Sequence, residues 1–182
     1  MKYNKEQLIK KYEQKENIKY LFFWGHTPGK DGSIGKSCFS QWWIAPFEVE
    51  GIIYKTAEHW MMAEKARLFN DEKHLAEIIK CNSPAEAKKW GRKVTGFIPE
   101  KWDTHKYEIV KQGNIHKFSQ NQELKAFLLN TKHCVLVEAS PRDRIWGIGM
   151  GASNEKALNP NLWRGENLLG FALMEVRDEI KR

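Results

Sequence analysis

Apolar and polar positions repeat along most of the chain with the spacing of helices, and along a few short stretches with that of strands. Helices are expected over 56–69, 71–80, 83–91, 103–118, 121–129 and from 167 onward, and a peripheral helix over 5–17. Strands are expected at 18–24 and 134–138, and a hairpin joins 46–49 to 52–54. The pattern predicts an α+β fold: one mostly helical domain over residues 1–182, with about six helices around a small sheet.

Helix caps predict several of these boundaries. Thr56 can accept an orphan N–H at the start of its helix. Ser83, Pro84 and Glu86 form a capping-box pattern, and Gly91 is expected to end that helix. The later helices are expected to begin at three further caps, Asp103, Asn121 and Asn167.

The helix over 56–69 has two charged residues in the middle of its apolar side. That side collects Met61, Met62, Ala66, Leu68 and Phe69, and the opposite side collects Trp60, Ala63, Glu64 and Arg67. Glu58 and Lys65 lie on the apolar side, seven residues apart, which is about 10 Å along one face.

Two explanations fit this placement. Charged residues are rarely buried without partners, so Glu58 and Lys65 can form ion pairs with other segments or extend their charged ends into water. Alternatively, the helix lines a pocket, and a carboxylate and a lysine inside it provide a base or an electrostatic clamp. The pattern alone leaves both open.

Composition narrows the function classes. The net charge of +7 favours anionic partners such as phosphates, nucleotides or nucleic acid, although ordinary solubility also explains it. Eight tryptophans are more than a core of this size usually holds, which suggests stacking on flat rings. Three scattered cysteines and six histidines without a ligand spacing predict no disulfide scaffold, no metal and no cofactor. The absence of a long apolar stretch or signal-peptide core predicts a cytoplasmic protein without membrane contact.

Two segments, 25–36 and 140–166, show neither helix nor strand periodicity. The segment 25–36 holds several glycines and is expected to be a loop, and 140–166 is the longest irregular stretch. Long irregular stretches in compact domains are often functional. The glycines of 147–151 have neither dinucleotide-binding nor P-loop spacing.

Several single residues have both a functional and a structural explanation. Asp143 follows a strand, as catalytic carboxylates often do, or is a solvated turn residue. Trp102 and Trp146 can stack on a base or fill the core. His59 can line a pocket or be a structural histidine, and Arg92 can hold a phosphate or lie in a solvated basic turn.

A set of motifs, taken together, resembles the NADAR domain family over about residues 20–178. The motifs are Phe39-Ser-Gln-Trp42, Thr56-Ala-Glu-His-Trp60 with Lys65, Gly91-Arg92, Trp102-Asp103, Asp143-Arg-Ile-Trp-Gly147 and Trp163-Arg-Gly-Glu-Asn-Leu-Leu-Gly170. That family includes N-glycosidases acting on early riboflavin-pathway intermediates and enzymes that remove ADP-ribose from guanine in DNA. The resemblance implies hydrolysis of a C–N bond between ribose and a nitrogen base or amine.

The resemblance also implies roles for individual residues. Glu58, Asp143 and Lys65 are the expected catalytic residues. Glu58 and Asp143 would be a carboxylate pair, and Lys65 either a clamp or a nucleophile. The expected substrate-binding residues are Phe23, Trp24, Ser40, Gln41, His59, Arg92, Trp102, Trp146, Gly147 and Asn167. Gln41 replaces an Asn of some members, and Ile148 replaces an Asp, so substrate contacts can differ there.

The expected partners are a small ribosylated metabolite or ADP-ribosylated DNA, the latter with a cognate ADP-ribosyltransferase. One alternative is a binding module for ADP-ribose or a nucleotide without turnover. Another is a basic nucleic-acid-binding domain, which the lack of a basic run or known motif disfavours.

Overall fold

The computed structural model describes residues 1–29 and 32–181, and the fold is α+β, as the sequence predicts. The chain forms two compact units. Unit 1 combines Met1–Ser40 with Glu123–Arg182, and unit 2 is Gln41–Gln122. The prediction of a single domain over 1–182 stays a prediction. Within the described residues, no helix is long and apolar enough to cross a membrane.

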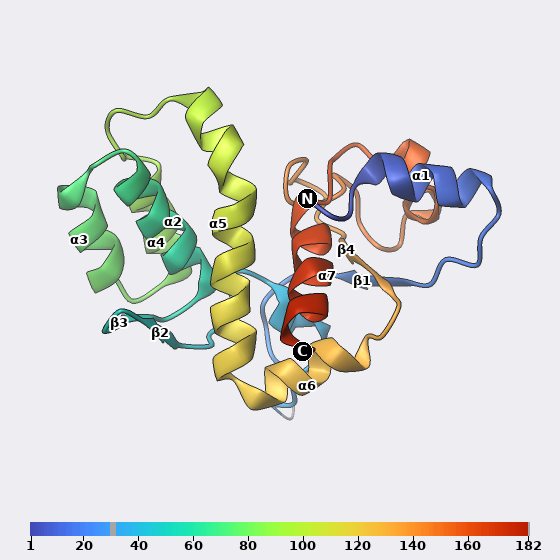
Figure 1. The fold of residues 1–182 in the computed structure, drawn as a ribbon, viewed down its shortest axis with the longest axis horizontal. Helices are drawn as coiled ribbons and strands as arrows, with labels where there is room; N and C mark the ends of the chain where they lie inside the picture. Colours follow the sequence, from blue (N-terminus) through green and yellow to red (C-terminus); the bar gives the residue numbers. More distant parts are fainter. Residues whose placement is uncertain (30–31, 182) are drawn as a thin grey trace. The chain divides into compact units, whose positions relative to one another are not determined.

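Unit 1 is built on a parallel strand pair. β1 (Tyr20–Phe23) pairs with β4 (Val135–Glu138), and α7 (Leu168–Ile180) packs against β4 (Figure 1). The remaining elements of the unit are α1 (Lys5–Glu13), η1 (Lys36–Phe39), α6 (Gln122–Asn130), η2 (Glu155–Leu158) and η3 (Pro160–Leu162). α7 is buried on almost every side, so the core of this unit lies between α7 and the strand pair.

Asn167 and Gly170 join α7 to β4. Asn167 is fully buried and has a positive φ of 56°. Its Nδ2 donates to the Leu136 carbonyl (2.9 Å), and its Oδ1 accepts from the Glu138 N–H (2.9 Å). Asn167 therefore occupies the expected N-cap position, but its side chain holds the strand and makes no cap hydrogen bond. At Gly170, an added Cβ would lie 2.1 Å from the Leu136 carbonyl oxygen.

Unit 2 encloses one helix with three others. α2 (Ala57–Leu68) contacts α3 (Glu72–Lys80), α4 (Pro84–Gly91) and α5 (Pro99–Gln120) (Figure 1). The antiparallel hairpin of β2 (Phe47–Val49) and β3 (Ile52–Tyr54) precedes α2. Its turn residues Glu50 and Gly51 both have positive φ, as in the tight turns that suit two-residue hairpins.

The local cap predictions hold in most places. The Thr56 side chain accepts from the His59 N–H at the start of α2, and Ser83 and Glu86 form the expected capping box. The strands and the hairpin lie where the pattern places them. The segment 25–36 has no helix or strand before residue 36 in its described part, and its residues 30 and 31 lie outside the described residues.

Three predictions are wrong in detail. The strands of the described residues form two separate two-stranded sheets instead of one small sheet. α5 begins at Pro99, four residues before the expected cap Asp103, because proline suits the first helical position, where no N–H is needed. Asp103 lies inside the helix and pairs with Lys106 (2.6 Å).

The third error concerns the expected polar side of α2. Trp60 and Ala63 are buried, because α2 is covered by several helices and not by one layer. The Trp60 indole donates to the Ile109 carbonyl of α5 (2.9 Å). Gly113 permits this approach, since a Cβ there would lie 2.3 Å from the indole Cδ1.

We predict that Gly170→Ala destabilises the protein by about 2–3 kcal/mol, because the added methyl group meets strand backbone that has no room to move. Gly151→Ala is the matched control, since its Cβ would find only Pro141 Cγ at 3.8 Å. We expect the control to change stability by less than about 0.5 kcal/mol. Urea unfolding of both variants measures the difference, and equal stabilities would contradict the packing described for α7 and β4.

Candidate functional site

The predicted site residues fall into both units. Unit 2 holds Gln41, Glu58, His59, Lys65, Arg92 and Trp102, and unit 1 holds Phe23, Trp24, Ser40, Asp143, Trp146, Gly147 and Asn167. The pairing of Glu58 with Asp143 stays a prediction.

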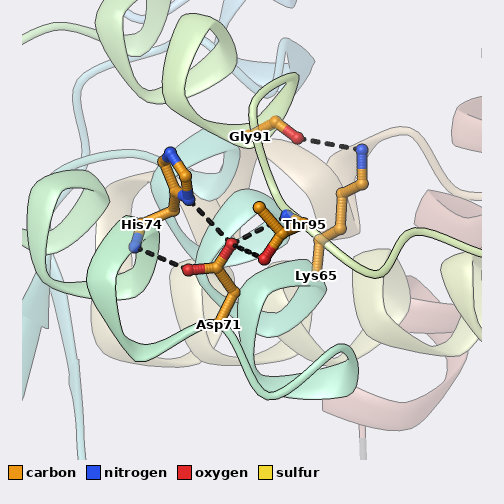
Figure 2. A network of polar contacts seen from close by, with 5 residues as sticks. All are labelled: Lys65, Asp71, His74, Gly91 and Thr95. Carbon is orange, nitrogen blue, oxygen red and sulfur yellow. Dashed lines mark hydrogen bonds and ion pairs between the residues drawn. The ribbon is translucent and has the colours of Figure 1, made fainter.

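Lys65 is a partly buried amine of unit 2. Its ammonium donates to the carbonyl of Gly91, the last residue of α4 (2.9 Å, Figure 2). It also lies over the Phe97 ring at 4.2 Å and the Trp102 ring at 5.6 Å. Burial lowers the pKa of this amine below its ordinary value. Lys65 is therefore a partly desolvated amine with a carbonyl on one side and aromatic faces on another.

Glu58 lies in the first turn of α2 and is 5% exposed. Its backbone N–H donates to the Gln41 carbonyl (2.9 Å), so Gln41 is held at the start of the helix. A carboxylate in the first turn is also favoured by the helix dipole. The two charges that the sequence places on the apolar side of this helix are thus both withdrawn from water, Glu58 almost completely and Lys65 in part.

Gln41 forms a buried amide pair with Asn114 of α5. Asn114 Nδ2 donates to Gln41 Oε1 (2.7 Å) and also lies 2.9 Å from the Val110 carbonyl. Gln41 Nε2 and Asn114 Oδ1 are buried and have no hydrogen-bond partner among the described protein atoms. Buried polar atoms are normally paired, so this donor and acceptor are suited to a bound water or ligand.

His59 is 1% exposed, and its Nδ1 lies 2.8 Å from the Thr56 hydroxyl. Burial lowers the pKa of His59, the nearby Lys55 charge lowers it further, and contacts with the Cys81 backbone and Glu86 act in the opposite direction. The ring is therefore held neutral inside the unit. The contacts of Nδ1 fit a structural histidine, whereas Nε2 is buried without a hydrogen-bond partner among the described protein atoms. A contact with substrate stays a prediction.

Arg92 and Trp102 lie at the two ends of the connection between α4 and α5. Arg92 is the exposed C-cap residue of α4. Its neighbour Lys93 lies over the Trp90 ring at 4.4 Å. Trp102 belongs to the first turn of α5, so the prediction that it precedes that helix is wrong. Its ring nevertheless reaches Lys65, so the structure brings these two predicted site residues together.

The aromatic and hydroxyl candidates of unit 1 have different surroundings. Phe23 is 2% exposed and packs edge-on against Phe39, which makes it a core residue. Trp24, the next residue, is 63% exposed. Ser40 is partly buried at the C-cap of η1. Of these three, Trp24 has the ring that is free to stack on a ligand.

Asp143 organises the loop that carries Trp146 and Gly147. Its Oδ1 accepts from the N–H groups of Ile145 (2.9 Å) and Trp146 (2.8 Å). A Cβ at Gly147 would lie 2.7 Å from the Glu138 carbonyl oxygen, so glycine permits this close backbone approach. The Gly147 carbonyl in turn accepts from the Asn167 N–H (3.2 Å). These residues have a clear structural role, and their contacts with substrate stay predictions.

Metal-binding side chains do not gather anywhere in the described ranges. Over residues 1–29 and 32–181, no three His, Cys, Asp or Glu side chains are grouped so that they could hold an ion.

Comparison with known proteins identifies the family. The profile described as NADAR domain matches residues 22–181. The chain belongs to the NADAR family.

Its relatives include proteins named as glycosidases. N-glycosidase R617 of Acanthamoeba polyphaga mimivirus is 43% identical over 169 residues, which cover 90% of this chain and 98% of that protein. N-glycosidase YbiA of Escherichia coli (strain K12) is 33% identical over 144 residues, 79% of either chain. The NMR structure of the E. coli protein YbiA superposes with a TM-score of 0.69 at 29% identity, covering 90% of this chain and 85% of that one. The predicted family resemblance is confirmed.

The sequence of this NADAR chain did not indicate three features of unit 2: the Gly91 carbonyl and the Phe97 ring beside Lys65, and the buried Asn114 beside Gln41. A backbone carbonyl gives no sequence signal. Phe97 lies in a basic connection without periodicity. Asn114 occupies a buried position of α5, and a polar residue among the apolar positions of a helix was the available signal.

We predict that the NADAR fold loses stability as the pH falls below about 6.5, partly through His59. A histidine whose folded pKa is lowered takes up a proton more readily in the unfolded chain, so stability is complete above the unfolded pKa and falls below it. His59→Gln should show a shallower dependence between pH 7.5 and 5.5. Urea unfolding across that range measures this, and parallel curves for the two proteins would exclude the assigned burial of a neutral ring.

Proposed function

We propose that this NADAR protein, an N-glycoside hydrolase, cleaves the C–N bond between ribose or ADP-ribose and a nitrogen base or amine, with Lys65 and Glu58 as reacting groups. The observation that carries the proposal is the partly desolvated amine of Lys65, held against the Gly91 carbonyl and two aromatic rings. The relatives' names as N-glycosidases support the reaction class.

Lys65 acts as the nucleophile in this proposal. A lysine attacks carbon only as the neutral amine, and burial increases the neutral fraction by lowering its pKa. The lone pair of the Lys65 nitrogen bonds to the anomeric carbon as the bond from that carbon to the base breaks. The base leaves with the electron pair of the broken bond and takes up the proton that the newly alkylated ammonium loses. Water then displaces the amine from the sugar and regenerates free Lys65. Phe97 and Trp102 offer faces on which the departing heterocycle can stack.

Glu58 supports the positive charge that develops on the ribose ring, or activates the water of the second step. It lies two helical turns before Lys65, about 10 Å away along α2, so one ribosylated substrate can contact both. Gln41, whose carbonyl accepts from the Glu58 N–H, has an unpaired Nε2, and its partner Asn114 has an unpaired Oδ1. This donor and this acceptor suit sugar hydroxyl groups, which both donate and accept.

Two substrates fit this chemistry. One is a ribosylamino-pyrimidine phosphate of the riboflavin pathway. The other is ADP-ribosylated guanine in DNA, for which a cognate ADP-ribosyltransferase would supply the modified strand. A specific observation favours the polyanion: exposed cations follow one another from α4 through the connection to the start of α5, namely Lys89, Arg92, Lys93 and Lys101.

We predict that both Glu58→Gln and Lys65→Arg lower kcat by at least about 100-fold while the fold is retained. Glutamine keeps the shape of Glu58 without its charge, and arginine keeps the charge of Lys65 but never supplies a neutral amine. Products from ADP-ribosylated DNA and from the ribosylamino-uracil phosphate are measured separately by mass spectrometry.

The wild-type result decides between the substrates. Release of ADP-ribose from DNA alone supports ADP-ribosylated guanine as the substrate, and cleavage of the metabolite alone supports the ribosylamino-pyrimidine phosphate. Full activity of either variant would contradict the assigned roles. Tight ADP-ribose binding without any product would favour a binding module instead.

A further inference from the structure

The carboxylate of Asp71 joins two segments of unit 2 (Figure 2). Asp71 is the N-cap of α3 and is 7% exposed. Its Oδ2 accepts from the Thr95 N–H (2.7 Å) and the Thr95 hydroxyl (2.8 Å), and contacts His74 Nδ1 (2.7 Å). Its Oδ1 accepts from the His74 N–H (3.0 Å). Both oxygens are thus engaged, one of them by a segment 24 residues further along the chain.

Thr95 lies between the residues that surround the Lys65 ammonium. Gly91, whose carbonyl accepts from Lys65, precedes Thr95 by four positions, and Phe97, whose ring lies under the ammonium, follows it by two. Figure 2 shows both links, from Thr95 to Asp71 and from Lys65 to Gly91. A displacement of Thr95 would therefore disturb the connection that begins after Gly91 and carries Phe97, two of the three groups that contact Lys65.

Asp71 is itself fixed to the helix of Lys65. Its backbone N–H donates to the carbonyl of Ala66, the residue that follows Lys65 (2.9 Å). The connection 92–98 has few other anchors, because all of its residues except Val94 are exposed. Besides Asp71, the end of α2 holds this region through the Phe69–Phe97 ring contact (5.3 Å) and, at the start of α5, through the bond from Lys101 to the Leu68 carbonyl (2.8 Å).

The carboxyl group of Asp71 is stabilised in its ionised form. Hydrogen bonds, those from the Thr95 and His74 backbone being the largest, keep the pKa of this carboxyl far below its usual range. The link to Thr95 is therefore present at every pH near neutrality.

We propose that Asp71 is a positioning residue for Lys65: by holding Thr95, it keeps the Gly91 carbonyl and the Phe97 ring against the Lys65 amine. The proposal rests on the proposed function for its effect on catalysis, but its structural part can be tested without turnover. Asp71 acts through Thr95 and contacts none of the reacting atoms.

The test compares Asp71→Asn, Thr95→Ala and Ser83→Ala. Asparagine keeps the size of Asp71 but loses the charge, and Thr95→Ala removes one of the two Thr95 donors. Ser83→Ala removes a helix cap in the same unit without touching the connection 92–98, so it controls for general loss of stability. The Lys65 Hε and Cε NMR signals, assigned by their loss in Lys65→Arg, report the ring-current shift from Phe97. The kcat and KM values are measured on the better substrate.

We expect Asp71→Asn to move the Lys65 signals towards those of an exposed lysine and to lower kcat by about 10- to 100-fold, because small displacements at a reacting group have such effects. Thr95→Ala should do the same to a smaller degree, and Ser83→Ala should leave both readouts as in the wild type. If Asp71→Asn does not fold, Thr95→Ala decides alone.

Unchanged Lys65 signals in folded Asp71→Asn, or displaced signals with full activity, would overturn the proposal. Wild-type protein without glycosidase activity on either substrate would refute the proposed function instead, and the Lys65 signals would still decide whether Asp71 positions the amine.

Discussion

The enclosure of α2 is the constraint on which unit 2 depends. Three helices cover it, so its residues are withdrawn from water on several sides, including positions that a single apolar face would leave exposed. Glu58 and Lys65 are desolvated as a result. Burying a charged amine costs free energy, and the Gly91 carbonyl and the Phe97 ring offset part of that cost, the ring contact alone by about 1 kcal/mol. The remaining cost is expressed as a lowered pKa, which is the property that nucleophilic chemistry needs.

The elements predicted correctly from the sequence are those fixed by local interactions. Thr56 and the pair Ser83 and Glu86 act within one helical turn, and the Glu50-Gly51 turn specifies its hairpin directly. The prediction of Asp103 as a helix cap is wrong because Pro99 offers a second valid start for the same helix, and nothing local decides between the two. The prediction of one small sheet is wrong because strand pairing depends on segments more than a hundred residues apart, as with β1 and β4.

The candidate site, too, was predictable only where local sequence carries the signal. Glu58 and Lys65 could be selected because a charge in the middle of an apolar stripe is visible in the sequence. Their partners could not, since Gly91 contributes only a carbonyl and Phe97 is brought to Lys65 by the hydrogen bonds of Asp71 with Thr95. In unit 1, Asp143 and Asn167 were singled out for chemistry, and the structure gives each a backbone-holding role. Polar residues in such roles and polar residues in active sites produce the same sequence pattern.

The most direct test of the account is to trap the sugar on Lys65. A glycosylated amine opens to an iminium ion, which cyanoborohydride reduces to a stable secondary amine. Turnover of a cleaved substrate in the presence of this reductant should add the mass of the reduced sugar portion to the peptide that contains Lys65, and not to the corresponding peptide of Lys65→Arg. Sustained turnover without any adduct on that peptide would contradict the role of Lys65 as nucleophile and leave it as an electrostatic clamp.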